Sequence, residues 1–301
     1  TLYFSNMLFP IFLFLSVIWF TSKMANNTEV IAMLSSGISF GRFLRPYLFA
    51  ASFIACFAFI GGMFVVPKSN EGFNAFNYKY INKTKARETT DLFKQINSNE
   101  IIYVSNYNPV RKRANNFSIE RFENNKLVSK LTANTLRWIQ RDSVFRLSTV
   151  VERTFDGDIE LLKSSTRKDT LFNFAIEELA PVTYKAETLN LFELNTFIQK
   201  ERDSGSKLIN AHLLIRHKRW SLPLSAFILT IIAVAMSSFK RRGGMGVNLA
   251  IGITLGFLYI FFDKIFSVMV LKANFDPMIA AWLPLFLFGF LAFYLLNYAK
   301  R

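Results

Sequence analysis

The chain has 301 residues, of which 51% are hydrophobic and 34 are phenylalanine, and this composition is unusual for a soluble protein. The formal net charge is +15, but the basic residues are distributed over the whole chain, which argues against a nucleic-acid-binding protein and favours anionic lipid as a partner. A single cysteine, Cys56, excludes a disulfide bond within the chain.

Five apolar runs predict transmembrane helices, because each approaches or exceeds the roughly 20 residues that cross a hydrocarbon layer of ~30 Å. The polar middle of the chain divides them. We therefore expect two transmembrane helices in 1–66, a separate domain in 67–219 and three transmembrane helices in 220–301. The runs cover about 2–24, 43–66, 220–239, 246–270 and 278–298.

The basic residues that flank these runs predict how the chain lies in the membrane. One side of the predicted bundle is rich in them, whereas the short loop at 270–277 on the other side has only Lys272 together with Asp276. By the positive-inside rule the basic side is cytoplasmic, so we expect the middle domain in the periplasm of a Gram-negative cell. The basic side carries Lys23, Arg42, Arg45, Lys240, Arg241, Arg242, Lys300 and Arg301.

A polar segment with a helical apolar stripe links the first two runs. Asn26 or Asn27 can cap a short helix over 27–36, and Glu29 falls in its first turn, where the helix dipole favours a carboxylate. Gly37 ends the helix. On its own, such a glutamate more often stabilises the helix dipole than contacts a partner. The apolar stripe consists of Val30, Ile31, Met33 and Leu34.

The middle domain changes from a helical to a strand pattern. Residues 68–86 continue as a helix, and from about residue 91 hydrophobic and polar residues alternate with a period of two. Asn124-Asn125 and Asp156-Gly157 mark turns, so the strands predict an antiparallel sheet, folded as a sandwich, a jellyroll or an open barrel. We assign strands to 91–96, 100–107, 116–123, 126–138, 143–155 and 159–163, and further helices to 189–204 and 210–219.

The sequence lacks the motifs of common enzyme and nucleotide sites. It has no G-x-x-x-x-G-K-[ST] phosphate loop, no H-E-x-x-H zinc motif and no G-x-S-x-G nucleophile motif. Its two histidines, His212 and His217, are five residues apart and do not share a helix face, so we expect no metal site and no cofactor. The chain is not predicted to be an enzyme, and any ATP-driven step requires a partner.

Ionisable residues occur in or beside the predicted membrane helices, where they are candidates for function. Asp263 and Lys264 lie inside the fourth run, about 18 residues or ~27 Å from its cytoplasmic end, which also fits a place at the outer interface. Three basic residues precede the third run and either anchor it at the lipid headgroups or contact an anionic lipid phosphate. They are Arg216, Lys218 and Arg219.

Two stretches resemble the LptF/LptG permease family of the lipopolysaccharide exporter. The segment TEVIAMLSSGIS at 28–39 is similar to a family element of the form [ST]-E-x-x-x-M-x-[AS]-[SC]-G between two spans. The C-terminal third contains RWSLPLSAFILTIIAVAMS, GVNLAIGITLGFLYIFFDKIF and PMIAAWLPLFLFGFLAFYLL, which are similar to the family's last three spans. The order of elements agrees over nearly the whole sequence, although the strand region matches in pattern only.

The resemblance implies a fold class and a function. We expect an α-helical membrane protein with an inserted all-β, jellyroll-like periplasmic domain. Five transmembrane helices lie in this sequence and six are expected in the full chain. In the family, two paralogous permeases, F and G, pair with a cytoplasmic ABC ATPase dimer (LptB) and extract lipopolysaccharide from the inner membrane. The lipid then passes to periplasmic jellyroll bridge proteins. The sequence does not distinguish the F from the G subunit.

The resemblance also implies roles for particular residues. Glu29 matches the glutamate of the family's coupling helix, so the short helix is expected to contact the ATPase through Glu29, Val30, Met33, Leu34 and Gly37. The family's fifth span is a lateral gate and maps onto 246–269, where the lipid path is expected at Gly252, Gly256, Tyr259, Asp263 and Phe266. The candidates for contact with lipid phosphate remain Arg216, Lys218 and Arg219.

Two alternative functions stay open at this point. One is a permease for another lipid or for a lipoprotein, which the identity of the bound lipid would distinguish. The other is a membrane-anchored periplasmic scaffold or signalling protein, which needs no motor. Copurification of an ATPase subunit argues against the scaffold.

Overall fold

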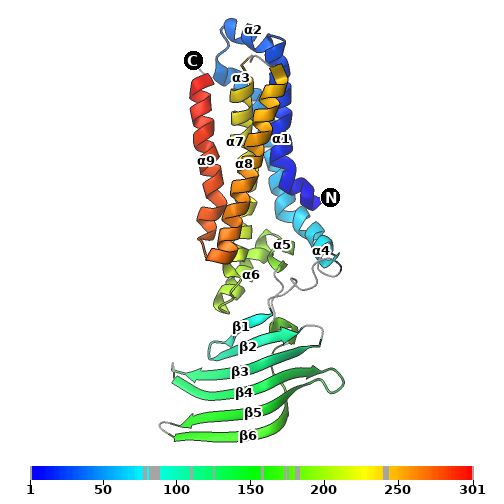
Figure 1. Cartoon of the computed structure of the whole chain (residues 1–301), viewed down its shortest axis with the longest axis vertical. Coiled ribbons are helices and arrows are strands. Elements are labelled where there is room, and N and C mark those ends of the chain that lie inside the picture. The colour runs from blue at the N-terminus through cyan, green and yellow to red at the C-terminus, as the bar shows by residue number, and fades with distance from the viewer. Residues whose placement is uncertain are drawn as a thin grey trace. The chain divides into compact units, whose positions relative to one another are not determined.

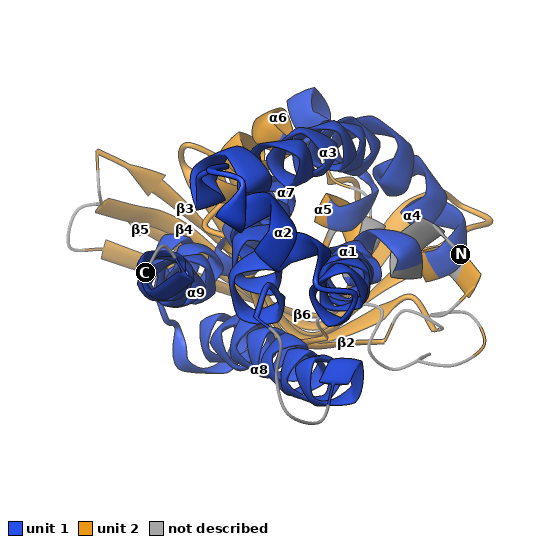
Figure 2. Ribbon diagram, turned by 90° about the horizontal axis from the view of Figure 1, so that it is seen from above, with its two compact units in different colours: residues 1–73, 187–194, 210–301 blue, residues 74–186, 195–209 orange. Residues whose placement is uncertain are grey.

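The structure, a computed structural model, describes residues 2–76, 80, 89–108, 111–124, 126–156, 159–172, 174, 176–179, 184–239 and 244–299. The chain divides into two compact units (Figure 2). Unit 1 comprises residues 1–73, 187–194 and 210–301, and unit 2 comprises residues 74–186 and 195–209. Each unit is described separately below.

Among the described residues, five helical stretches are long and apolar enough to cross a membrane. Together with the antiparallel sheet described below, they confirm the predicted helical membrane protein with an inserted β domain. The helices (Figure 1) are α1 Leu2–Asn26, α2 Glu29–Ser35, α3 Phe40–Ile60 with its continuations η1 Gly61–Val65 and α4 Val66–Phe76, α5 Lys185–Thr188, α6 Leu191–Asp203, α7 Ile209–Ser237, α8 Gly244–Ala273 and α9 Pro277–Ala299.

Helix α7 is the most deeply buried of the long helices. Of the residues in the most apolar part of each helix, 67% are buried in α7, compared with 22% in α8 and 33% in α9. Small side chains on α7 let neighbouring helices approach closely, and close packing is a main source of helix association in lipid. The buried small residues of α7 are Ser221, Ser225, Ala226, Thr230, Ala233, Ala235 and Ser237.

Helices α1 and α8 pack against each other through two glycines of α8. A Cβ atom added at Gly252 would lie 2.3 Å from Cδ1 of Ile18, which is itself completely buried. One turn further along α8, a Cβ atom added at Gly256 would lie 3.7 Å from the ring of Phe14, which is an ordinary contact. The G-x-x-x-G motif therefore permits the close approach of α8 to α1.

Unit 2 contains an antiparallel sheet whose six described strands lie in consecutive order, β1-β2-β3-β4-β5-β6. All six strands predicted from the alternating pattern are present. The turn predicted after β3 includes Asn124, which has φ 50°, whereas Asn125 and Gly157 of the predicted turns lie outside the described residues. The strands are β1 Thr90–Asn97, β2 Glu100–Asn108, β3 Arg113–Glu123, β4 Lys126–Ile139, β5 Val144–Asp156 and β6 Ile159–Thr170.

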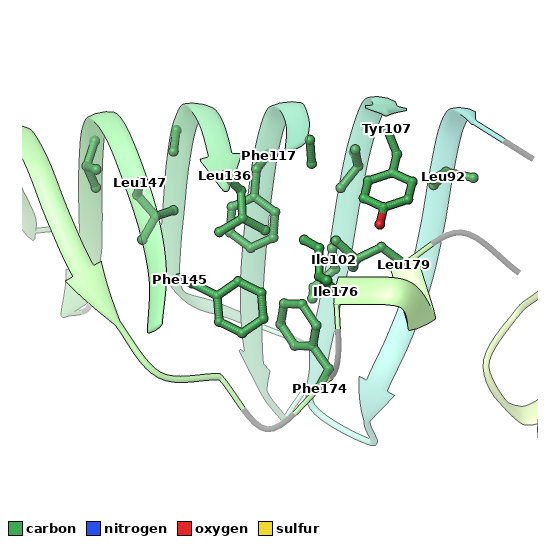
Figure 3. Packing of buried hydrophobic residues seen from close by; sticks show 14 residues of the cluster. Leu92, Ile102, Tyr107, Phe117, Leu136, Phe145, Leu147, Phe174, Ile176 and Leu179 are labelled. Carbon is green, nitrogen blue, oxygen red and sulfur yellow. The ribbon is translucent and has the colours of Figure 1, made fainter. Parts of the chain in front are cut away.

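One face of this sheet buries the apolar core of unit 2 (Figure 3). Phe117 of β3 and Phe145 of β5 are each about 1% exposed. After β6 the chain returns over the same face, where the ring of Phe174 lies 5.1 Å from that of Phe145 and the short 3-10 helix η3 Ile176–Leu179 adds two buried side chains. The returning segment removes from water part of the apolar face that one sheet layer alone would expose.

Helix α6 begins at a capping box. The side chain of Asn190 accepts a hydrogen bond from the backbone N–H of Glu193 over 2.9 Å, and Glu193 Oε2 accepts one from the backbone N–H of Asn190 over 3.0 Å. The helix ends two residues before Gly205, whose φ of 65° suits glycine. These signals explain why the helix matches the prediction for 189–204.

We expect Gly252→Val to destabilise the packing of α8 on α1. The added side chain would overlap Ile18, and overpacking of this kind typically costs about 1–3 kcal/mol. Thermal unfolding of the detergent-solubilised protein should show a lower midpoint, and Ile18→Ala in the same chain should restore part of the loss. Gly246→Val is the control, because nothing lies within 4 Å of a Cβ atom added there. Equal losses in both valine variants would attribute the effect to helix propensity and not to packing.

An ion pair between Arg146 and Asp169 joins β5 to β6 in unit 2, and Arg167 of β6 pairs with the same carboxylate. The guanidinium group of Arg146 donates two hydrogen bonds of 2.9 Å to the carboxylate of Asp169, and Arg167 donates another of 3.0 Å. The hydrogen bonds from Arg146 and then from Arg167 hold the pKa of Asp169 well below its usual value of 3.8. Because all three side chains are partly exposed, their contribution to stability is modest.

Asp169→Asn should lower the stability of unit 2 at neutral pH and have less effect in acid. Folding lowers the pKa of Asp169, so its ion pairs stabilise the fold above about pH 4 and this contribution is lost as the pH falls. Urea unfolding measures the difference between the two chains through the fluorescence of Trp138, with Trp19, Trp220 and Trp282 replaced by Phe. A difference that stays constant from neutral pH down to about pH 3 would contradict this role of Asp169.

Candidate functional site

Helix α2 lies at the end of unit 1 where α9 ends (Figure 1). Glu29 is its first residue and is exposed, and the side-chain amide of Asn27 donates a hydrogen bond of 2.9 Å to Glu29 Oε1. The predicted cap at Asn26 or Asn27 is wrong. The capping position is Thr28, which has φ 65° and makes no side-chain hydrogen bond to the helix. Asn27 instead positions the carboxylate of Glu29.

The apolar stripe of α2 is used mainly for packing inside unit 1. Val30 is completely buried, and Met33 and Leu34 are partly buried against the same cluster. Ile31, in contrast, is 49% exposed. Val30 was predicted to contact a partner, but its burial makes it a residue that attaches α2 to the chain's own helices. The buried members of the cluster are Ala25, Val30, Phe40, Phe43, Leu44, Val234, Ala235 and Ala299.

The outer surface of α2 is small and carries one negative charge. Gly37 ends the helix as predicted, with φ 91° and with its N–H donating a hydrogen bond of 3.1 Å to the carbonyl oxygen of Leu34. The carboxylate of Glu29 can accept a hydrogen bond from a basic or polar group of a partner. The small and apolar side chains around it can be covered by the same partner. The exposed residues are Glu29, Ile31, Ala32, Ser35, Ser36, Gly37 and Ile38.

A second feature of unit 1 is a cavity of about 210 Å³ lined by α1, by the continuous helix of α3 and α4, and by α7 and α8. Prolines and aliphatic side chains form much of its wall, and ionisable side chains are also present. Such a volume suits a headgroup fragment and not a whole lipid. The ionisable residues in the lining are the cations Lys218, Arg219 and Lys264 and the acids Glu187 and Asp263, with Tyr259.

Lys218 of α7 and Asp263 of α8 form an ion pair in the wall of this cavity. The ammonium nitrogen of Lys218 lies 2.7 Å from Asp263 Oδ2 and 2.6 Å from the hydroxyl oxygen of Ser267. The hydroxyl of Ser267 in turn donates a hydrogen bond to the backbone carbonyl oxygen of Asp263. The side chains of the pair are only 20% and 24% exposed. Residues 45 positions apart in the sequence thus form one polar group.

The three basic candidates do not lie together. Lys218 and Arg219 both line the cavity, and Arg219 donates a hydrogen bond of 2.6 Å to the backbone carbonyl oxygen of Leu189. Arg216 is absent from the lining. Residues two positions apart on an α-helix lie about 200° apart around the axis, so Arg216 and Lys218 point to different sides of α7.

The residues predicted to form a lateral gate on α8 pack mostly inside unit 1. Gly252 and Gly256 face α1, and the buried ring of Tyr259 packs edge-to-face on Phe288 with centroids 5.2 Å apart. Phe266 belongs to a cluster with α7 and α9.

The sequence analysis did not single out the exposed apolar face of α8. Its residues follow one another at spacings of three or four, which is the helical signal that identifies them. They are Ile253, Phe257, Phe261, Ile265 and Val268. This face and the residues that pack inside unit 1 are distinct parts of the same helix.

Within the described part of the chain, no group of three or more His, Cys, Asp or Glu side chains could hold a metal ion. The charged groups of the site include Lys218, Arg219 and Lys264 in the lining of the cavity and Glu29 at the first position of α2.

Comparison with known proteins identifies the family. The family model described as "Lipopolysaccharide export system permease LptF/LptG" matches residues 1–298. The lipopolysaccharide export system permease protein LptG of Escherichia coli strain K12 is 23% identical over 291 residues, which cover 96% of this chain and 80% of LptG. LptG of Escherichia coli O6:H1 is similar to the same extent. The chain therefore belongs to the LptF/LptG family of lipopolysaccharide export permeases, which are multi-pass proteins of the inner membrane.

Proposed function

We propose that this chain is a permease subunit of an ATP-driven exporter that extracts lipopolysaccharide from the inner membrane of a Gram-negative cell. The observation that carries the proposal is the family match over residues 1–298, which includes the five apolar helices and the sheet of unit 2. The partners are a cytoplasmic ABC ATPase dimer, a paralogous permease and periplasmic jellyroll bridge proteins.

The ATPase docks on the exposed side of α2 in this proposal. The sequence has no phosphate loop, so the energy of ATP must reach the chain through a contact, and α2 offers an exposed carboxylate at Glu29. A hydrogen bond from the ATPase to this charged group contributes about 1.5–3 kcal/mol once it is removed from water. Ile31, Met33, Leu34 and Gly37 supply the surrounding contact area.

The buried side of α2 transmits the movement. Val30 lies in one cluster with side chains of α1, α3, α7 and α9, so a displacement of α2 acts on four long helices at once. Close-packed protein interiors deform little, so a displacement of one buried side chain displaces the side chains in contact with it. Closure of the ATPase dimer thus moves the helices as levers and narrows the lipid-binding space of the permease pair.

Unit 2 receives the lipid in the periplasm. One face of the sheet is lined by apolar residues, as acyl chains require, and the returning segment with Phe174 and η3 covers part of that face (Figure 3). In this proposal the periplasmic jellyroll bridge proteins continue the apolar track beyond the six-stranded sheet.

The lipid headgroup contacts the cationic side chains of the unit 1 cavity. Lys218 and Arg219 are the residues that carry this role, because both line the cavity. Arg216, on another side of α7, serves to anchor the helix among the lipid headgroups. Gly252, Gly256, Tyr259 and Phe266 support the gate helix α8, whose exposed apolar face meets lipid or the partner permease.

Glu29→Lys should uncouple the permease from its ATPase. Charge reversal removes the hydrogen-bond acceptor and repels a basic partner group, so association should weaken by at least about tenfold, in line with a charged hydrogen bond. The measurement is the amount of ATPase that copurifies with the permease pair, together with lipopolysaccharide export in cells that depend on the variant.

The matched control is Asn297→Lys, which adds a positive charge at an exposed position in the last turn of α9, outside the proposed contact surface of α2. It should retain association and export. Normal copurification and export in Glu29→Lys would remove Glu29 from the proposed contact. Purification without any ATPase subunit would favour the scaffold alternative, and a bound lipoprotein or phospholipid in place of lipopolysaccharide would favour a permease for another cargo.

A further inference from the structure

The ion pair in the cavity wall places the carboxylate of Asp263 on Lys218, the cation that a phosphate of the proposed cargo would contact. Lys218 and Asp263 both line the cavity, and the ammonium group of Lys218 already has two acceptors, Asp263 Oδ2 at 2.7 Å and Ser267 Oγ at 2.6 Å. The ammonium group has three N–H donors, so a lipid phosphate that accepts more than one hydrogen bond from Lys218 must displace or share these acceptors. The acid and the hydroxyl both come from α8, whereas the lysine comes from α7.

We propose that Asp263 is a specificity-determining counter-ion, held in place with Ser267, which reserves Lys218 for lipids whose phosphate groups can replace a carboxylate. The inference rests on the proposed function, because it takes lipopolysaccharide as the cargo. Asp263 is a positioning residue in this scheme: it acts on the cargo through Lys218 and not by contact with it.

The cavity is nearly balanced in charge, and this gives the proposal its physical basis. Three cations and two carboxylates line it, so loss of one carboxylate from the set leaves a clear positive excess. A charge with so little access to water is stabilised chiefly by its partner, and removing that partner alone is strongly unfavourable. Replacement of the carboxylate by a phosphate oxygen keeps the ammonium group paired and allows exchange.

Exchange of the Asp263 carboxylate for a lipid phosphate on Lys218 distinguishes lipids by their headgroups. A phosphate that carries an unpaired negative charge can take the place of the Asp263 carboxylate on Lys218. The headgroup of phosphatidylethanolamine carries its own ammonium group, which already neutralises its phosphate. Such a lipid gains little from Lys218 and leaves the ion pair intact. The ion pair thereby discriminates against the bulk lipid of the membrane.

Asp263→Asn tests this inference in the full permease–ATPase complex, reconstituted in nanodiscs of phosphatidylethanolamine. Binding is measured for lipopolysaccharide with intact lipid A phosphates, for the same material after enzymatic removal of those phosphates, and for phosphatidylglycerol. The variant should bind the phosphorylated lipopolysaccharide roughly tenfold more tightly than the parent, the scale of one charged hydrogen bond, and the dephosphorylated form equally well.

Further variants keep the test valid if Asp263→Asn folds poorly. Ser267→Ala removes a neutral acceptor of Lys218 and leaves no unpaired charge, so it should raise the affinity for phosphorylated lipopolysaccharide by about twofold to fivefold, as for a neutral hydrogen bond. Lys218→Met should lower the affinity for the phosphorylated form only. The double variant Lys218→Met with Asp263→Asn should behave as Lys218→Met, because Asp263 acts through Lys218. Asp263→Glu should resemble the parent.

Each remaining outcome counts against the proposal. Equal affinities of parent and Asp263→Asn for the phosphorylated lipid overturn it, and so does a loss of affinity for both forms, which a purely structural role predicts. A gain confined to phosphatidylglycerol assigns the cavity to phospholipid and overturns it as well. Binding of neither form of lipopolysaccharide by the parent overturns the proposed function itself, whereas binding by the parent without a selective gain in the variants overturns this inference alone.

Discussion

Close packing around α7 is the constraint on which unit 1 depends. Water is excluded from the middle of a bilayer, so helices there associate through close contact and through paired polar groups. α7 meets this requirement with a long series of buried small residues. The same helix supplies Val234 and Ala235 to the cluster that holds α2, and Lys218 to the cavity. One rigid element therefore connects the proposed ATPase contact with the proposed headgroup site.

The fold of unit 2 depends on a different constraint, which is the covering of the apolar face of its sheet. A sheet in water needs a covered apolar face, and here the chain that follows β6 returns to provide that cover with aromatic side chains. The rings of Phe145, Phe172 and Phe174 pack on one another and fix where the returning segment lies. The ion pairs of Asp169 add a smaller contribution at the junction of β5 and β6.

The sequence predicted the elements well because each element has a local signal. Apolar runs identified the long helices, a period of two identified all six strands, and Gly37 marked the end of α2. The side-chain contacts in the candidate site were harder to predict from the sequence. A stripe such as that of α2 shows that one face is covered, but not whether a partner or the chain itself covers it, and Val30 proved to be internal. The pairing of Lys218 with Asp263 joins two helices and has no local signal.

Two left-handed backbone residues enclose α2, Thr28 at φ 65° and Gly37 at φ 91°. Threonine is branched at Cβ and rarely adopts this conformation, so its backbone is set by the surrounding fold and not by its own preference. The seven residues of α2 span only about 10 Å, and the links on either side are too short to absorb a rotation. A force applied at Glu29 therefore displaces the long helices directly, because the short links on either side of α2 cannot absorb the movement.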